Sequence, residues 1–166
     1  MAGGSKHPSD EWHYALELLD RILEAHDLEV RRGTGGHTNG ALGPITRRVF
    51  RTLATEPGAF TRPVPFDRKD VAIYSGCSEL TVSKALARLA DAGMATVSGK
   101  RGAWLVQLCL PSHIFAAYEA YERRFAERDD ERCPGPVSQQ ELARVLALLD
   151  REEADRLDAH GSLTRH

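Results

Sequence analysis

The chain has 166 residues, of which 42% are hydrophobic and 28% charged, and a formal net charge of −2. These proportions fit a soluble globular protein with one domain, with or without helical extensions. The sequence excludes a transmembrane helix, since no apolar run approaches the roughly 18 residues that a span needs. The N-terminus also lacks the apolar core of a signal peptide, so we expect a cytoplasmic protein.

Charge is distributed unevenly along the chain. Residues 1–30 hold two basic and seven acidic side chains, residues 31–104 hold twelve and five, and residues 105–166 hold eight and twelve. The net charges of these three stretches are therefore −5, +7 and −4. A basic region between acidic flanks is typical of a protein that binds nucleic acid through one surface.

The first predicted element is a helix from about Glu11 to about His26, which Ser9 or Asp10 can cap. Its apolar residues recur at helical spacing, and Leu18 lies off the face that they form. The residues of this face are Trp12, Ala15, Leu16, Leu19, Ile22 and Leu23. The face is wide for a lone surface helix, so we expect it to pack on a partner helix.

Two segments without regular structure flank this helix. Residues 1–8 are small and polar and are predicted to be a disordered tail. Residues 31–43 contain five glycines and are predicted to be a flexible link. The phosphate-binding patterns GxGxxG and GxxxxGK[ST] are absent, so a solvated link is favoured over a nucleotide-binding loop. The helix and the link form a first region at 9–43.

Pro44 suits the first turn of the next helix, which is predicted to run to about Glu56. Its apolar face is formed by Ile45, Val49, Phe50 and Leu53. The stretch from Thr61 to Pro65 contains two prolines, which predict a short edge strand or an extended linker.

A helix-turn-helix is predicted next. Asp67 can cap its first helix, which ends near Tyr74. Gly76, in the turn Ser75-Gly76-Cys77, supplies the positive φ of a tight corner. Ser78 caps the second helix at 78–92, and Ala92-Gly93 ends it.

The second helix has two distinct faces. One is apolar and predicted to face inward: Val82, Ala85, Leu86 and Leu89. The other is predicted to face outward: Thr81, Ser83, Lys84, Ala87 and Arg88. An amphipathic helix of this kind can pack on a core while its polar face meets a ligand.

Two short apolar runs follow, at 94–97 and 103–108, and are predicted to be the strands of a hairpin. Its tip at 98–102 reads Ser-Gly-Lys-Arg-Gly, so it is predicted to be flexible and strongly positive. A hairpin in this place is a wing. We therefore expect a winged helix-turn-helix domain at 44–110.

Two further helices are predicted in residues 111–160. The first opens at Pro111-Ser112 and ends near Glu131, and the second begins with a capping box of Ser138 and Glu141. Their apolar faces are Ile114, Ala117, Tyr118, Tyr121 and Phe125, and Leu142, Val145, Leu146 and Leu149. Nothing obvious in a lone winged helix covers such faces, so this region is predicted to take part in dimerisation.

The run SGCSELTVSKALARLADAG resembles the winged-helix regulators. The matching positions are Gly76, Ser78, Thr81, Val82, Ala85, Leu86 and Leu89. The local motif is similar to the GntR type, and the order of elements over 9–150 resembles the MarR family. This resemblance implies a mainly α (α+β) fold in which N- and C-terminal helices form a homodimer. It also implies recognition helices in successive major grooves of double-stranded DNA.

The residues predicted to bind DNA come from three places. The second helix contributes Ser78, Glu79, Thr81, Ser83, Lys84 and Arg88, the wing contributes Lys100 and Arg101, and the start of the first helix contributes Arg68 and Lys69. Lysine and arginine bind phosphates or guanine edges, and hydroxyls bind either. A carboxylate repels phosphates, so Glu79 fits only the amino group of a cytosine. A solvated helix face is the alternative for Lys84 and Arg88.

Other chemistry has little support. Cys77, Cys109 and Cys133 are widely separated, which favours free thiols in a reducing compartment. The seven histidines show no metal-binding spacing and no catalytic motif is present, so we predict no metal, no cofactor and no enzyme activity. A small-molecule effector is not indicated. Four aromatic residues could line a pocket for one but are predicted to be core: Trp12, Tyr118, Tyr121 and Phe125.

These observations predict a dimeric, sequence-specific transcriptional regulator, with repression as the favoured mode. Helix 78–92 would read the major groove, and the wing 98–102 would contact the backbone or the minor groove. Two alternatives stay open. One is a replication or partition protein of a plasmid or phage, and the other is a winged-helix adaptor that binds a protein.

Overall fold

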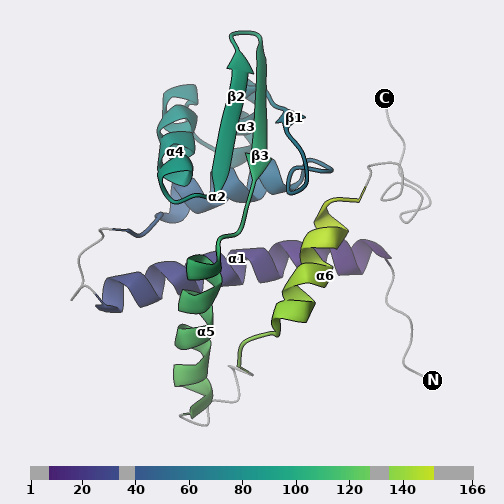
Figure 1. Cartoon of the computed structure of the whole chain (residues 1–166). Coiled ribbons are helices and arrows are strands. Elements are labelled where there is room, and N and C mark those ends of the chain that lie inside the picture. Colours follow the sequence, from purple (N-terminus) through teal and green to yellow (C-terminus); the bar gives the residue numbers. More distant parts are fainter. Residues whose placement is uncertain (1–7, 34–39, 128–134, 152–166) are drawn as a thin grey trace.

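The computed structural model describes residues 8–33, 40–127 and 135–151 (Figure 1). Within these ranges the protein is mainly helical with one small sheet, as predicted. The helices are α1 (Pro8–Gly33), α2 (Pro44–Ala54), α3 (Arg68–Ser75), α4 (Glu79–Asp91), α5 (Ser112–Glu127) and α6 (Gln139–Leu149). The strands are β1 (Val64–Pro65), β2 (Ala95–Lys100) and β3 (Ala103–Leu108). Of the helices described, none combines the length and the apolar character needed to cross a lipid bilayer.

The three strands form an antiparallel sheet in the order β1-β3-β2. β1 pairs with β3 through Val64 opposite Val106. Of the two alternatives predicted for 61–65, a short edge strand or an extended linker, the edge strand is therefore found, over Val64 and Pro65 only. β2 continues to Lys100, which lies opposite Ala103. The turn of the hairpin is therefore shorter than the predicted 98–102, because residues 98–100 belong to β2.

Gly99 makes this tight hairpin possible. Its φ is 95°, a conformation that side chains other than glycine rarely adopt. A Cβ at this position would also lie 2.2 Å from the carbonyl oxygen of Ala103. Only glycine therefore fits this point of β2.

α1 is the longest helix, and it packs on α2, α5 and α6. It extends beyond the predicted end at His26 to Gly33, and Arg31 and Arg32 in its last turn suit the negative end of the helix dipole. Leu18 is 2% exposed, so the prediction that it lies off the apolar face is wrong. The reason is that α1 is covered from several sides, which makes its buried surface wider than one stripe.

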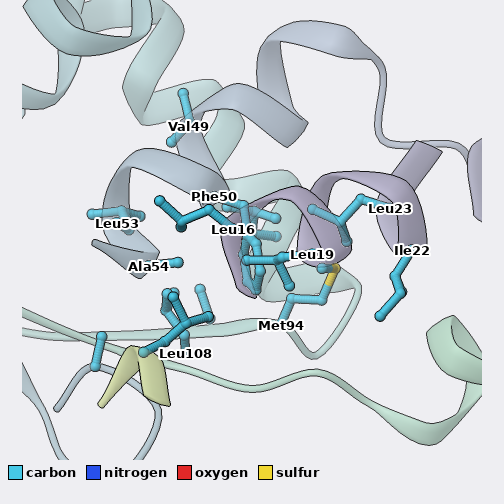
Figure 2. Close-up of a cluster of buried hydrophobic side chains, with 14 of the residues drawn as sticks. Leu16, Leu19, Ile22, Leu23, Val49, Phe50, Leu53, Ala54, Met94 and Leu108 are labelled. Atoms are coloured by element: carbon cyan, nitrogen blue, oxygen red, sulfur yellow. The ribbon is translucent and has the colours of Figure 1, made fainter. Parts of the chain in front are cut away.

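The main core lies where α1 and α2 meet the sheet (Figure 2). Leu16 and Leu19 of α1 gather there with Phe50 and Leu53 of α2. Met94, which directly precedes β2, and Leu108, the last residue of β3, also belong to this cluster. A single contiguous core thus joins the N-terminal helix to the region predicted as the winged helix.

The apolar faces of the terminal helices are covered within the chain. Ile114 and Tyr118 of α5 and Val145 and Leu149 of α6 are each at most 1% exposed. α1 lies against both helices, so these faces do not require a second copy of the chain. The reasoning that predicted a dimer from uncovered faces is therefore wrong, and the homodimer stays a prediction.

Polar contacts reinforce this arrangement. Ion pairs join α1 to α5, Arg21 to Glu122 and Glu29 to Arg124. The Tyr14 hydroxyl of α1 donates a hydrogen bond of 3.0 Å to Glu141 of α6. Since α1 makes apolar and polar contacts along much of its length, it is the scaffold on which the other elements are placed.

Several predicted faces differ in detail. Ile45 of α2 is 42% exposed, and the neighbouring Thr46 is buried instead. Phe115 and Glu122 join the buried face of α5, and Leu148 replaces Leu146 in that of α6. α2 ends at Ala54 rather than Glu56.

Some predictions fall outside the described residues. These are the tail at 1–7, the central part of the link at 34–39, the end of the first C-terminal helix at 128–131, Cys133 and the charged continuation at 152–160. Pro8 already belongs to α1, so the predicted tail is too long by one residue.

Candidate nucleic-acid interface

α3 and α4 meet at a corner that their own residues define. Asp67 accepts a hydrogen bond of 2.8 Å from the backbone N–H of Lys69, which caps α3. Gly76 ends α3 in the left-handed conformation, with φ 70°. Ser78 then caps α4 by accepting from the N–H of Thr81 at 3.1 Å. The three predicted signals of the corner are therefore confirmed.

Side chains of α2 make hydrogen bonds that stabilise this corner. Arg48 of α2 donates a hydrogen bond of 3.1 Å to the carbonyl of Ser75, and the Ser75 hydroxyl donates one of 3.0 Å to Thr52. Ser75 is fully buried. The end of α3 is thus anchored by charge-assisted and neutral hydrogen bonds, which favours a rigid presentation of α4.

The outward face of α4 matches the predicted one at Lys84, Ala87 and Arg88, which are exposed. The helix is also exposed at Glu79, Leu80, Ala90 and Asp91, and Leu80, Lys84, Ala87 and Asp91 lie along one line. Thr81 and Ser83 are only half-buried flanks of this line. The hydroxyls of Ser78 and Thr81 are also 2.9 Å apart and bonded to each other. Helical spacing from the buried Val82 and Leu86 would have identified Leu80 as outward.

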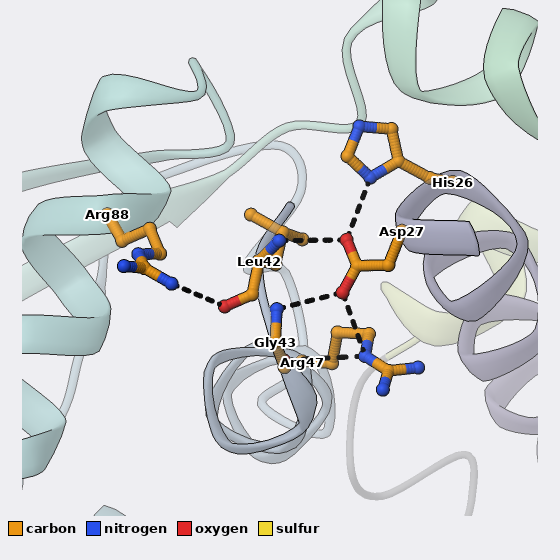
Figure 3. Close-up of polar contacts among 6 residues, drawn as sticks. All are labelled: His26, Asp27, Leu42, Gly43, Arg47 and Arg88. Carbon is orange, nitrogen blue, oxygen red and sulfur yellow. Dashed lines mark hydrogen bonds and ion pairs between the residues drawn. The ribbon is translucent and has the colours of Figure 1, made fainter. Parts of the chain in front are cut away.

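Arg88 is an exposed residue of α4 whose side chain also makes a hydrogen bond within the chain. Its Nη1 donates a hydrogen bond of 3.0 Å to the carbonyl oxygen of Leu42 (Figure 3). This bond ties the recognition-helix candidate to the segment that precedes α2. A DNA contact through Nη1 of Arg88 would compete with this bond, but the bond leaves the other donors of the guanidinium unused, so Lys84 and Arg88 are both exposed cations of α4.

Asp27 fixes the same segment from the other side (Figure 3). Its carboxylate accepts hydrogen bonds of 2.8 Å from the N–H groups of both Leu42 and Gly43. It also pairs with Arg47 Nε at 3.2 Å, and His26 Nδ1 lies 3.1 Å away. The sequence did not indicate this site, because its members are separated by up to twenty-one positions and form no motif.

The environment of Asp27 keeps it ionised. Burial opposes ionisation, but the hydrogen bonds from His26, Leu42 and Gly43 and the charge of Arg47 outweigh it, so the pKa of Asp27 lies below its ordinary value. Asp27 is 3% exposed, so an unpaired charge at this position would be strongly unfavourable. The carboxylate is therefore a structural anchor between α1 and the start of α2.

The β2–β3 hairpin extends away from α1 alongside α4 (Figure 1). Lys100 and Arg101 at its tip are exposed. Glu79, the first residue of α4, lines the same cavity of about 300 Å³ as Gly102 of the hairpin turn. The start of α4 and the hairpin tip therefore lie at one end of the molecule.

Arg68 and Lys69 differ in their surroundings. The Arg68 guanidinium lies over the ring of Trp104, 5.0 Å from its centroid, and both residues line the cavity shared by Glu79 and Gly102. Stacking of this kind holds the start of α3 against β3. Lys69 is exposed. Arg68 thus has a visible structural contact, whereas Lys69 is an open cation at a helix N-terminus.

Large apolar side chains are also exposed near this corner. Tyr74 is 78% exposed, and Ile73 and Leu80 are each 66% exposed. These are the three most exposed large hydrophobic residues in the part of the chain that the structure describes. They fall within eight positions of one another, in α3 and the first turn of α4.

The other predicted candidates are placed as follows. Tyr118 is buried and Trp12 and Tyr121 are half-buried against the core, as predicted for core aromatics. Phe125 is half-buried, with its ring centroid 4.8 Å from that of Tyr121. Cys77 and Cys109 are free thiols. Within the described ranges no three His, Cys, Asp or Glu side chains come together as metal ligands would. No protein-family model, no curated protein and no solved structure matches this chain.

Proposed function

We propose that this chain is a sequence-specific DNA-binding regulator of transcription with a winged helix-turn-helix. In this proposal α4 enters the major groove and the β2–β3 hairpin contacts the backbone or the minor groove. One observation carries it. The start of α4 and the hairpin tip lie at the same end of the molecule, and both elements carry exposed cations, Lys84 on α4 and Lys100 and Arg101 on the hairpin.

The distribution of charge supports the proposal. The stretch 31–104 has a net charge of +7, and it contains α2, α3, α4 and most of the sheet. The flanking stretches, which form α1, α5 and α6, are acidic. A duplex would be attracted to one end of the molecule and repelled by the helical scaffold, which orients the encounter.

A homodimer that acts as a repressor is the second part of the proposal. It rests on the order of elements, which resembles dimeric regulators, and not on uncovered helix faces. A two-fold dimer would bind a pseudo-palindromic site with half-sites about one helical turn apart. Light scattering of the free protein and of its DNA complex measures the number of chains in each.

Selection from a pool of random duplexes tests this function. The full chain should enrich one motif over successive rounds, and an inverted repeat within it would support the dimer. Repression is then tested with a reporter whose promoter overlaps the selected site. A pool that stays random while the protein is folded would refute sequence-specific binding.

A second candidate, an adaptor that binds a protein, is favoured by the exposure of Ile73 and Tyr74 on α3. Tyr74 also lines a cavity of about 790 Å³ between α2, β1 and α3, with the carboxylates of Glu56 and Asp70 at its edge. An adaptor would keep its protein partner after Lys84→Ala and would show no affinity for DNA. A replication or partition protein would select repeated sites in one orientation instead of one inverted repeat.

A further inference from the structure

α4 begins with two exposed residues that do not suit phosphates. Glu79 is negatively charged and exposed, and it would be repelled by the DNA backbone. Leu80 is 66% exposed and has no group that can bond a phosphate oxygen. If α4 binds DNA, its first turn must therefore lie over base edges, while phosphate contacts fall to Lys84 and the hairpin. This agrees with helix-turn-helix complexes, in which the N-terminal residues of the recognition helix contact bases.

We propose that Leu80 is a specificity-determining residue that recognises the C5-methyl group of a thymine in the major groove. This inference rests on the proposed DNA-binding function and adds which chemical group on the DNA Leu80 recognises. Leu80 is on the outward line of α4, one turn before Lys84 and two turns before Ala87.

The chemistry of the major groove leaves few partners for a leucine. Unmodified base edges present hydrogen-bond donors and acceptors there, and the thymine methyl is the apolar exception. Covering a donor or acceptor with Leu80 would remove its water without a replacement bond, which is unfavourable. Covering a methyl group removes apolar surface from water on both sides, which is favourable.

Glu79 complements this contact. Its carboxylate accepts hydrogen bonds, so it suits the exocyclic amino group of a cytosine close to the thymine. The two residues together predict a half-site in which a thymine lies near a cytosine. Leu80 and Glu79 together would therefore make the start of α4 selective for a DNA sequence without a positively charged side chain.

Uracil replacement tests the inference on a duplex selected as described above. Uracil lacks only the methyl group, so each thymine is replaced in turn and affinity is measured by fluorescence anisotropy. We expect wild type to lose about three- to fivefold in affinity at one thymine position, the effect of burying one methyl group. Leu80→Ala should bind the thymine and uracil duplexes equally at that position.

Two variants control the experiment. Lys84→Ala should weaken binding to both duplexes and keep the ratio between them. Leu80→Met keeps an apolar side chain and should retain discrimination. Because Leu80 is exposed, circular dichroism of its variants should match wild type.

The outcomes separate the two proposals. Failure to select any duplex would refute the proposed function. A specific complex that tolerates uracil at every position, or a ratio that survives Leu80→Ala, would overturn the role of Leu80 and leave DNA binding intact.

Discussion

Replacing Asp27 with asparagine tests whether one buried carboxylate holds α1 to the start of α2. The wild-type carboxylate accepts two backbone hydrogen bonds of 2.8 Å, from Leu42 and Gly43, and pairs with Arg47 at 3.2 Å. Hydrogen bonds to charged groups contribute about 1.5–3 kcal/mol each. Asparagine keeps one acceptor oxygen but places an amide donor against another donor. We therefore expect the free energy of unfolding to fall by about 2–4 kcal/mol.

Urea denaturation followed by circular dichroism measures this loss at neutral pH. Asp20→Asn is the matched control, because Asp20 is also on α1 and pairs with Arg51 of α2 at 3.0 Å. Both side chains of that pair are more than 40% exposed, so its contribution is about 0–1 kcal/mol. Equal losses for the two variants, or a loss below about 0.5 kcal/mol for Asp27→Asn, would refute the reasoning.

The pKa of Asp27 adds a pH dependence with a definite sign. Its folded-state pKa lies below the ordinary value of 3.8, so its ionisation stabilises the fold above that pH. The stabilisation is lost as the pH falls from about 4 through the folded-state pKa. The difference in stability between wild type and Asp27→Asn should therefore shrink below about pH 4. A difference that stays constant down to pH 2 would contradict the assignment.

Three further variants test separate parts of the fold. Gly99→Ala should destabilise the protein by about 1–3 kcal/mol, since a positive φ and the carbonyl of Ala103 both exclude a Cβ. Thermal melting would measure this loss of stability. An unchanged melting temperature would contradict the tight turn. Ser78→Ala removes the cap of α4 and should lower stability by about 1 kcal/mol, with faster hydrogen exchange in the first turn of that helix. Arg88→Ala removes the bond to Leu42 and should also lower the free energy of unfolding by about 1 kcal/mol. Its affinity for DNA should fall less than that of Lys84→Ala. The opposite order would show that the Arg88 side chain gives up its bond to Leu42 in order to bind DNA.

Features encoded by a few neighbouring residues could be predicted from the sequence. Asp67, Gly76 and Ser78 act on backbone groups within four positions of themselves, so the corner between α3 and α4 follows from local chemistry alone. The same holds for the inward face of α4, because a period of 3.6 residues assigns each side chain a direction. The edge strand at Val64 followed from the prolines around it.

Features that depend on contacts between distant segments could not be predicted. Leu18 is buried because helices far along the chain cover α1 from several sides. Arg88 resembles any outward arginine until the position of Leu42 is known, forty-six residues earlier in the chain. An apolar helix face requires a partner, but its sequence does not identify that partner. The apolar faces of the terminal helices, from which a dimer was predicted, are buried against each other within one chain.

Salt-dependent binding to DNA tests the central claim most directly. Fluorescence anisotropy of the full chain on a mixed-sequence duplex, between about 50 and 200 mM salt, measures how many phosphate contacts form. We expect affinity to fall steeply with salt, and Lys100→Ala/Arg101→Ala to reduce the slope of log affinity against log salt by about two. Arg123→Ala/Arg151→Ala removes two cations, the first on α5 and the second just after α6, and should leave the slope unchanged. No binding at low salt, or equal slopes for both double variants, would contradict an interface formed by α4 and the hairpin.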